Sequence, residues 1–353
     1  MHHGIAFTTL VAGVLSSAVA LPAQETTEPV YRFGGVDIYG TDAIAVAEFG
    51  TRFGGRARAL LDAVQQNDGA AVDTIAQSMS GEIRRLADFA WIDMALIYDP
   101  SDTTAYMTFD VVERADSVRR MSFAPVPAGQ VEDPAGLLAL WRAYEDTVLQ
   151  RMIRGQMPPK PTPADCPALH CVGAFGADPT VGRYERAFVT DAPRHTAMLL
   201  RVLREDADEA DRGAAAYLLA HAAEPDSAVA ALVAAMRDPS ARVRNNATRV
   251  LMMAATLRAE LDVPLEPVLE SIDSPTTTSR NKALYLLAAL SLRPELHDRI
   301  RRQAAPTLLR LLRLIQPNNH HPAYLVLKNI SGESFGDRDY DAWERWLQRA
   351  GAL

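Results

Sequence analysis

The sequence predicts a mainly helical protein in which a small unit of mixed strands and helices precedes a stack of helical pairs. Ala and Leu dominate the 48% hydrophobic fraction, and both residues favour helix. Alternating apolar residues typical of strands occur early in the chain, whereas an apolar helix, a breaker and a second apolar helix recur downstream of about residue 190. We therefore divide the 353-residue chain into domains at 30–114 and 181–353, joined by residues 115–180.

Residues 1–23 are typical of a secretory signal peptide. An apolar run from Ile5 to Leu21 is followed by small residues, with candidate cleavage sites after Ala20 and Ala23. The run is short for a membrane span, and histidines precede it where Lys or Arg is usual. No cysteine follows the run to carry a lipid, and no later segment is apolar enough to cross a bilayer. We expect an exported protein, periplasmic or secreted, with no stable membrane anchor.

The formal net charge of −8 restricts the classes of partner. Non-specific binding to nucleic acid or to an anionic membrane requires positive charge that neutralises phosphates. An acidic chain therefore argues against both, although local basic patches remain compatible with it. We expect no nucleic-acid partner.

Five elements are expected in the first domain. A short strand at 36–40 precedes two amphipathic helices at 44–64 and 72–86, whose apolar residues recur every three or four positions. Two strands with alternating apolar residues follow at 92–98 and 107–111. The predicted order is therefore strand, helix, helix, strand, strand.

This order resembles that of a polypeptide-transport-associated (POTRA) domain over residues 30–114. The segments that carry the resemblance are the opening residues 32–40 and the closing residues 106–113. The resemblance implies a three-stranded sheet backed by two helices, and a partner that adds a strand to an exposed sheet edge. A small α+β domain that only caps the helical pairs remains the alternative.

Residues 115–136 are expected to form a linker, because Pro125, Pro127, Gly129 and Pro134 interrupt regular structure. One amphipathic helix is expected at 137–153. Residues 156–180 are rich in proline and should be irregular.

The chain contains two cysteines, Cys166 and Cys171, and both lie in the irregular segment. In an oxidising compartment two such cysteines usually form a disulfide. His170 lies between them, so a metal site of the form Cys-x3-His-Cys is an alternative, but structural zinc needs a fourth ligand and none is nearby. We expect the disulfide, with free thiols and a metal site as the other possibilities.

Four helical pairs are expected downstream of residue 190. Their second helices align at Ala214, Ala247, Ala283 and Ala323, which lie 33, 36 and 40 residues apart. A small residue suits these positions because paired helices cross closely there. The first helices are expected at residues 195–205, 226–237, 264–272 and 294–315.

The segment 238–254 closely resembles a HEAT repeat, with Asp238 and Val243-Arg244 at positions characteristic of the family. Ser240 is expected to cap the second helix of this repeat. The resemblance implies an α-solenoid of about four to five helical pairs. A last helix carrying Trp343 and Trp346 would cover its open end.

In HEAT families the second helix of each pair usually lines the concave face. The resemblance therefore implies a polar partner-binding face made of Arg242, Asn246, Arg249, Asn281, Lys282, Tyr285, Tyr324 and Lys328. The alternative for each is an ordinary solvated helix face, with residues such as Arg244 bonding neighbouring repeats.

Matches to catalytic and metal-binding motifs fail in detail. Residues 332–336 fit G-x-S-x-G, but a helix precedes them where a nucleophile elbow needs a strand, and no histidine follows His321. Residues 337–348 begin like a calcium loop but carry Ala342 and Gln348 where Gly and Glu are required, and the acidic run 205–211 fails similarly. No zinc-protease, P-loop or dinucleotide motif occurs. We expect no cofactor and no bound metal.

The sequence therefore predicts an exported, non-enzymatic scaffold that binds a protein partner through the solenoid. An enzyme or enzyme subunit with an unrecognised site is the first alternative; a deep pocket with a perturbed acid or histidine between the two domains would favour it. A structural component of an envelope assembly is the second, and the sequence leaves the oligomeric state open.

Overall fold

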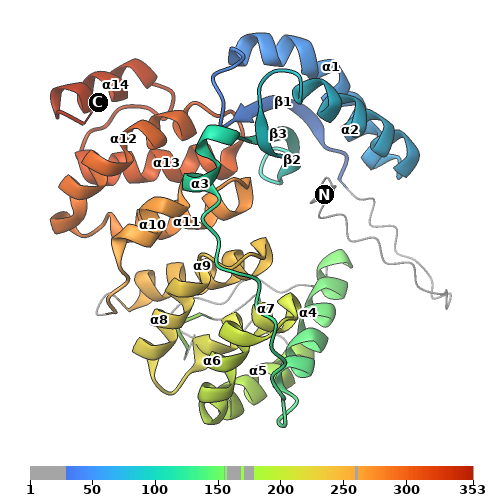
Figure 1. The fold of residues 1–353 in the computed structure, drawn as a ribbon, viewed down its shortest axis with the longest axis vertical. Coiled ribbons are helices and arrows are strands. Elements are labelled where there is room, and N and C mark those ends of the chain that lie inside the picture. Colours follow the sequence, from blue (N-terminus) through green and yellow to red (C-terminus); the bar gives the residue numbers. More distant parts are fainter. Residues whose placement is uncertain (1–28, 155, 157–167, 171–178, 259–260, 353) are drawn as a thin grey trace.

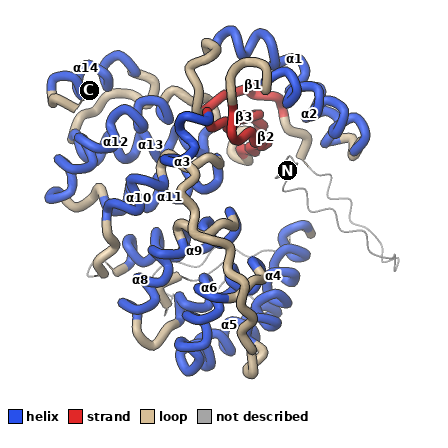
Figure 2. Tube along the Cα trace, viewed as in Figure 1, coloured by secondary structure: helices blue, strands red, loops and turns tan. Residues whose placement is uncertain are grey.

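The chain is mainly helical, with one three-stranded sheet near its N-terminus (Figures 1 and 2). The expected signal peptide, Cys166 and Cys171 lie outside the residues that the structure describes. The computed structural model describes residues 29–352, apart from 155, 157–167, 171–178 and 259–260.

The sheet contains β1 (Arg32–Tyr39), β2 (Phe89–Asp99) and β3 (Thr104–Glu113) in the order β1-β3-β2. β1 runs parallel to β3, and β2 runs antiparallel to it. Helices α1 (Val46–Gln65) and α2 (Gly69–Ile83) lie between β1 and β2 in the chain, so the predicted order of elements is present.

One face of the sheet forms a hydrophobic core with these two helices. Phe109 packs against the stacked rings of Phe49 and Phe53, and Met79 and Ile83 of α2 are buried in the same cluster. Because strand side chains alternate, the neighbours of Phe109 on β3 point to the opposite face. That second face is polar, and it contacts the helical part of the chain.

Helices follow one another in pairs along the rest of the chain. α9 packs against α7 and α11, and α11 packs against α13, while each first helix packs against its own second helix. The pairs are α6 (Thr196–Glu205) with α7 (Glu209–Leu218), α8 (Pro225–Ala235) with α9 (Ala241–Leu257), α10 (Leu265–Ser271) with α11 (Thr277–Leu290), and α12 (His297–Leu312) with α13 (Pro317–Ser331).

Further helices cover both ends of these pairs. α4 (Leu137–Ile153) packs against α5 (Pro179–Asp191) and α7, and α14 (Tyr340–Arg349) packs against α12. Trp343 of α14 is fully buried, whereas Trp346 is partly buried.

A recurring arginine shows how the second helices align with one another in sequence. Arg212, Arg244 and Arg280 each occupy the fourth position of their helix and donate to a carbonyl oxygen six residues earlier. Arg212 and Arg244 are 32 residues apart, so Ala215 corresponds to Ala247. The expected alignment at Ala214 was one residue out, because three consecutive alanines in α7 make the alanine match ambiguous.

The start of α9 differs from the expectation. Ser240 lies at the N-cap position, but its side chain accepts no capping hydrogen bond. Instead, Asp238 Oδ1 accepts a hydrogen bond from Ser240 N at 2.7 Å. The aspartate therefore fixes the turn before α9, and it also receives two hydrogen bonds from Arg212.

The segment expected to be a linker is bound to the helical pairs. We call residues 121–131 the strap; it follows the short helix α3 (Ser117–Arg120) and crosses the pairs (Figure 1). Ala124 N donates to Arg237 O at 2.6 Å, and Gly129 N donates to Glu205 O at 2.9 Å. The prolines exclude regular structure from the strap, but the backbone groups of Ala124 and Gly129 bond to residues at or just beyond the ends of α8 and α6.

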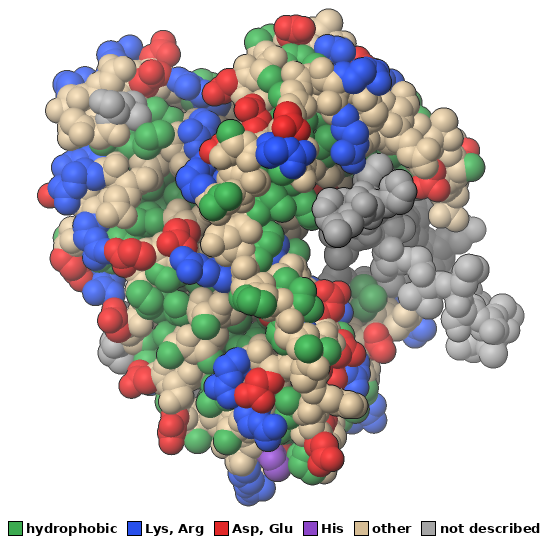
Figure 3. All heavy atoms as spheres, in the orientation of Figure 1, with side chains coloured by type: hydrophobic (Ala, Val, Ile, Leu, Met, Phe, Trp, Pro, Cys, Tyr) green, Lys and Arg blue, Asp and Glu red, His purple; other side chains and the backbone are tan. Residues whose placement is uncertain are grey.

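The surface carries mixed charge. Basic and acidic side chains are interspersed over the face drawn in Figure 3. Among the helices that the structure describes, none combines the length and the apolar character needed to cross a bilayer.

Candidate functional site

The polar face of the sheet docks onto the starts of two second helices. On β3, Asp110 Oδ2 accepts hydrogen bonds from Thr277 N and Thr277 Oγ1 at 2.6 and 2.7 Å, at the beginning of α11. Asp110 Oδ1 accepts a third from Arg280 Nη2 at 2.5 Å. Both charged side chains are excluded from solvent. This ion pair joins residues 170 positions apart in the sequence.

Asp37 of β1 makes the equivalent contact one helical pair further along. Its Oδ2 accepts hydrogen bonds from Ile315 N at 2.9 Å and Gln316 N at 3.0 Å, just before α13. Free N–H groups at a helix start favour a carboxylate. Two neighbouring strands therefore supply acceptors to two successive helices, and this contact fixes the sheet on the helical pairs.

A third contact surrounds Asp273, in the turn between α10 and α11. Tyr39 Oη donates to its Oδ1 at 2.5 Å, and Arg119 Nη1 donates to its Oδ2 at 2.5 Å. Burial alone would raise the pKa of this carboxyl, but the charge of Arg120 and the bonds from Tyr39 and Arg119 outweigh it and lower the pKa. Asp273 therefore stays ionised and holds these three side chains together.

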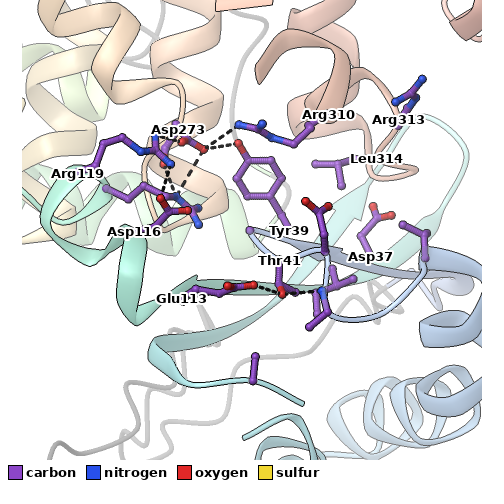
Figure 4. Close-up of a pocket in the computed structure, with 17 residues that line it drawn as sticks. Asp37, Tyr39, Thr41, Glu113, Asp116, Arg119, Asp273, Arg310, Arg313 and Leu314 are labelled. Carbon is purple, nitrogen blue, oxygen red and sulfur yellow. Dashed lines mark hydrogen bonds and ion pairs between the residues drawn. The ribbon is translucent and has the colours of Figure 1, made fainter. Parts of the chain in front are cut away.

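A cavity of about 650 Å³ lies beside this network, between the sheet and α12 (Figure 4). Arg119, Arg310 and Arg313 line it from the helices; Figure 4 shows Arg119 to the left of Tyr39, Arg310 above it and Arg313 to its upper right. Carboxyl groups line it on both sides. Asp37, Asp42 and Glu113 come from the sheet and the loop after β1, whereas Asp116 and Asp273 lie beside the arginines and pair with them. The lining of the cavity is therefore of mixed charge.

Two buried polar groups in the cavity lining have no hydrogen-bond partner among the described residues. They are Asp37 Oδ1 and Arg120 Nη2, on residues that are 1% and 6% exposed. The rest of Arg120 is fixed, since Nη1 donates to Val111 O and Nε donates to Asp273 O. Gly40 permits this approach, because its φ is +102° and a Cβ there would lie 2.4 Å from Arg120 Nη1. One donor and one acceptor of this buried network are thus without a partner among the described residues.

Burial raises the pKa of Asp37 to about 6, and the charge of Asp110 adds to the effect against the hydrogen bonds from Gln316 and Ile315. The other groups that the cavity offers are guanidiniums, carboxyls and the hydroxyls of Tyr39 and Thr41. Thr41 donates to Glu113 at 2.5 Å. These groups suit hydrogen bonding and charge pairing with a polar ligand.

The described residues contain no group of three or more His, Cys, Asp or Glu side chains placed to hold a metal ion. Asp337, in the segment that begins like a calcium loop, bonds His320 Nε2 at 2.9 Å. In the G-x-S-x-G segment, Gly332 ends α13 with φ +69°. Both segments therefore have local structural contacts.

The structure separates the expected partner-binding face into buried and exposed residues. Asn246 and Asn281 are 8% and 5% exposed, and their amides donate to Gly213 O and Asn318 O on the neighbouring second helices. They connect adjacent pairs, a role that the alternative gave to residues such as Arg244, and they are buried where a solvated face was the alternative. Their amide donors are therefore used within the chain.

The other six residues of that face have varied surroundings. Arg242 is exposed and pairs with Glu145 of α4 at 2.7 Å, while Lys282 donates to Asn281. Tyr324 is half-buried and donates to Phe335 O at 3.2 Å. Arg249 and Tyr285 are also half-buried, and Lys328 is exposed.

The docking residues were not among the candidates from sequence. The available signal was a charged residue inside a strand, since Asp37 lies between Val36 and Ile38, and Asp110 lies between Phe109 and Val111. Alternation places such residues on the second face of the sheet but does not say what covers that face.

Comparison with models of known protein families and with curated proteins gave no match. The site therefore rests on the geometry described above.

Proposed function

We propose that the protein is an exported, non-enzymatic scaffold that binds a protein partner. The helical pairs form a HEAT-like solenoid of four pairs, preceded by α4 and α5. The recurring arginines at the fourth position of α7, α9 and α11 support this arrangement. The sheet with α1 and α2 is a POTRA-like domain docked on the solenoid; its element order and its two backing helices support that resemblance.

The observation that carries the proposal is the outer edge of β2. β2 is the last strand of the sheet, and within the described part of the chain its backbone pairs with β3 alone. The strand has eleven residues, with neither Lys nor Pro, the residues that commonly protect an edge from pairing. An extended segment of a partner would add to this edge through backbone hydrogen bonds.

Affinity capture from envelope and secreted fractions tests this proposal. Ala95→Lys and Tyr98→Lys place a cation on β2, and Val118→Lys is the matched control, because Val118 is strongly exposed on α3. We expect one protein to be captured by the wild type and by the control, and to be lost with both β2 variants. Equal capture by all four proteins would overturn binding at β2.

An enzyme acting at the cavity is the second candidate. The observation that favours it is a buried carboxyl of raised pKa, Asp37, in a cavity between the sheet and the helices. Asp37 also accepts two backbone hydrogen bonds that dock the sheet, which gives it a structural role. A scaffold accounts directly for this structural role of Asp37 in attaching the sheet to the helical pairs, so we place the scaffold first.

A further inference from the structure

We infer that His320 is a pH-sensitive clamp, which holds the segment 332–339 against the end of α12 while its imidazole ring is charged. This segment joins α13 to α14, the helix that packs against α12 at the end of the helical pairs. The clamp is separate from partner binding at β2 and does not depend on it.

Both ring nitrogens of His320 face hydrogen-bond acceptors. Nδ1 lies 2.6 Å from Leu312 O, and Nε2 lies 2.9 Å from Asp337 Oδ2. A carbonyl oxygen and an ionised carboxylate accept hydrogen bonds and donate none. A neutral imidazole carries one N–H and can bond only one of the two, whereas an imidazolium donates to both. This geometry therefore fits the charged ring.

The groups around the ring favour a positive charge. Leu312 is the last residue of α12, so its carbonyl oxygen lies at the negative end of that helix. Asp337 is exposed, and the hydrogen bond from His320 is the largest of the effects that lower its pKa, to which the charge of Arg338 adds. Burial raises the pKa of Asp37 on β1, and the charge of His320 is among the effects that oppose this rise.

Loss of one proton releases Asp337 and leaves the bond to Leu312 in place. Leu312 is fully buried, so its carbonyl oxygen depends on the N–H of His320, whereas the exposed carboxylate of Asp337 can turn to water. Histidine side chains ordinarily change charge between about pH 5 and pH 8. The clamp is thus closed in acid and opens as the pH rises.

Other contacts confine the effect to the segment itself. Tyr324 Oη donates to Phe335 O at 3.2 Å, and Trp343 Nε1 donates to Gly336 O at 2.9 Å. Trp343 is fully buried and keeps α14 in place. Release of Asp337 therefore loosens the segment 332–339 without detaching α14.

Nitrogen-15 NMR of the purified full-length protein, labelled in histidine, tests the charge on the ring. His320→Gln identifies the signals of this side chain by their loss. We expect both ring nitrogens of His320 to carry a proton at about pH 6, and one of them to have lost it at about pH 8.5. A ring that is neutral at the lower pH, or still charged at the higher one, overturns the inference.

Hydrogen exchange of residues 332–342, followed by mass spectrometry, measures the clamp itself. After correction for the intrinsic exchange rate at each pH, protection in the wild type should fall roughly fivefold between these two pH values. In Asp337→Asn the fall should disappear, because an amide accepts from a charged ring and donates to a neutral one. His321→Gln, at the exposed neighbouring position, is the control and should behave like the wild type.

The variant Asp337→Asn also separates the clamp from other titrating groups. Burial raises the pKa of Asp37 to about 6 and that of Asp93 to about 7, so both titrate in the same range. Both are present in the wild type and in Asp337→Asn, so the difference between these two proteins isolates the clamp. The inference is overturned if protection of the segment in the wild type does not fall with pH, or if it falls as much in Asp337→Asn.

Discussion

The guanidinium of Arg280 and the carboxylate of Asp110 are both shielded from solvent, so each depends on the other to balance its charge. Arg280 also donates to Ser274 O and to Asn319 Oδ1, and its guanidinium lies 4.1 Å from the centre of the Tyr39 ring. Such a pair adds little net stability over an apolar contact, but removing one partner strands the other.

Asp110→Ala should therefore lower the free energy of unfolding by about 3–5 kcal/mol. The matched control is Arg242→Met, which breaks the more exposed ion pair with Glu145 and should cost less than about 1 kcal/mol. Urea denaturation followed by circular dichroism measures both. Similar losses for the two variants would show that the buried pair is not what fixes the sheet.

A second acid lies beside this pair. Asp93 of β2 is directly opposite Asp110 in the sheet; burial, followed by the charge of Asp110, raises its pKa to about 7. The Asp93 carboxyl therefore keeps its proton in the folded state, whereas in the unfolded chain it loses that proton above the ordinary aspartate pKa of about 4. The stability gained from this proton is complete below that value and is lost as the pH rises through about 7.

The protein should consequently be more stable at about pH 5 than at about pH 8, with Asp37 contributing through its pKa of about 6. Asp93→Asn should reduce the difference by roughly 1–3 kcal/mol. Asp88→Asn, at an exposed position before β2, should leave it unchanged. Denaturant titrations at both pH values check this. A difference unaffected by Asp93→Asn would contradict the assignment.

At the scale of elements, the strap depends on close backbone contact. Gly129 N and O bond to Glu205 O and Ala207 N, and a Cβ on Gly129 would lie 2.7 Å from Glu205 O. The contact leaves no space for a side chain. The strap therefore needs glycine here for proximity and not for an unusual φ.

Gly129→Ala should lower the free energy of unfolding by about 1–3 kcal/mol, since the strap must move away from α6. Gly81→Ala is the control: a Cβ there meets nothing within 4 Å, and alanine should stabilise α2 by up to about 1 kcal/mol. Thermal denaturation of the two variants should shift in opposite directions. A neutral Gly129→Ala would show that the strap is only loosely attached.

Local patterns account for what the sequence predicted at this scale. α4 spans Leu137–Ile153 as expected, because apolar residues recur through this segment with helical periodicity and Pro134 comes shortly before its first residue. Likewise, the alternation around Phe109 predicted β3 and its buried face. The docking of Asp110 on α11 depends on residues far away in the chain, and no local pattern specifies it. Of the candidate site, the sequence therefore indicated the strands and helices but not the contacts between them.

At the scale of the whole molecule, the sheet and the helical pairs are joined through three buried centres, Asp37, Asp110 and Asp273. These contacts join the unit of sheet, α1 and α2 to the helical pairs through three carboxyl groups that are buried. β2 remains at the outside of the sheet, with one side of its backbone unpaired within the described residues. The proposed scaffold thus presents a strand edge at a fixed place on a helical support.

Site-specific photo-crosslinking in the producing cell tests that claim most directly. A photoreactive phenylalanine replaces Tyr98, which is 37% exposed on β2, and in separate proteins it replaces Tyr285 and Tyr324 on the second-helix face. We predict a crosslink to one protein partner from position 98. A partner crosslinked only from positions 285 or 324 would move the binding surface to the helices, and no protein crosslink from any of the three would contradict the scaffold.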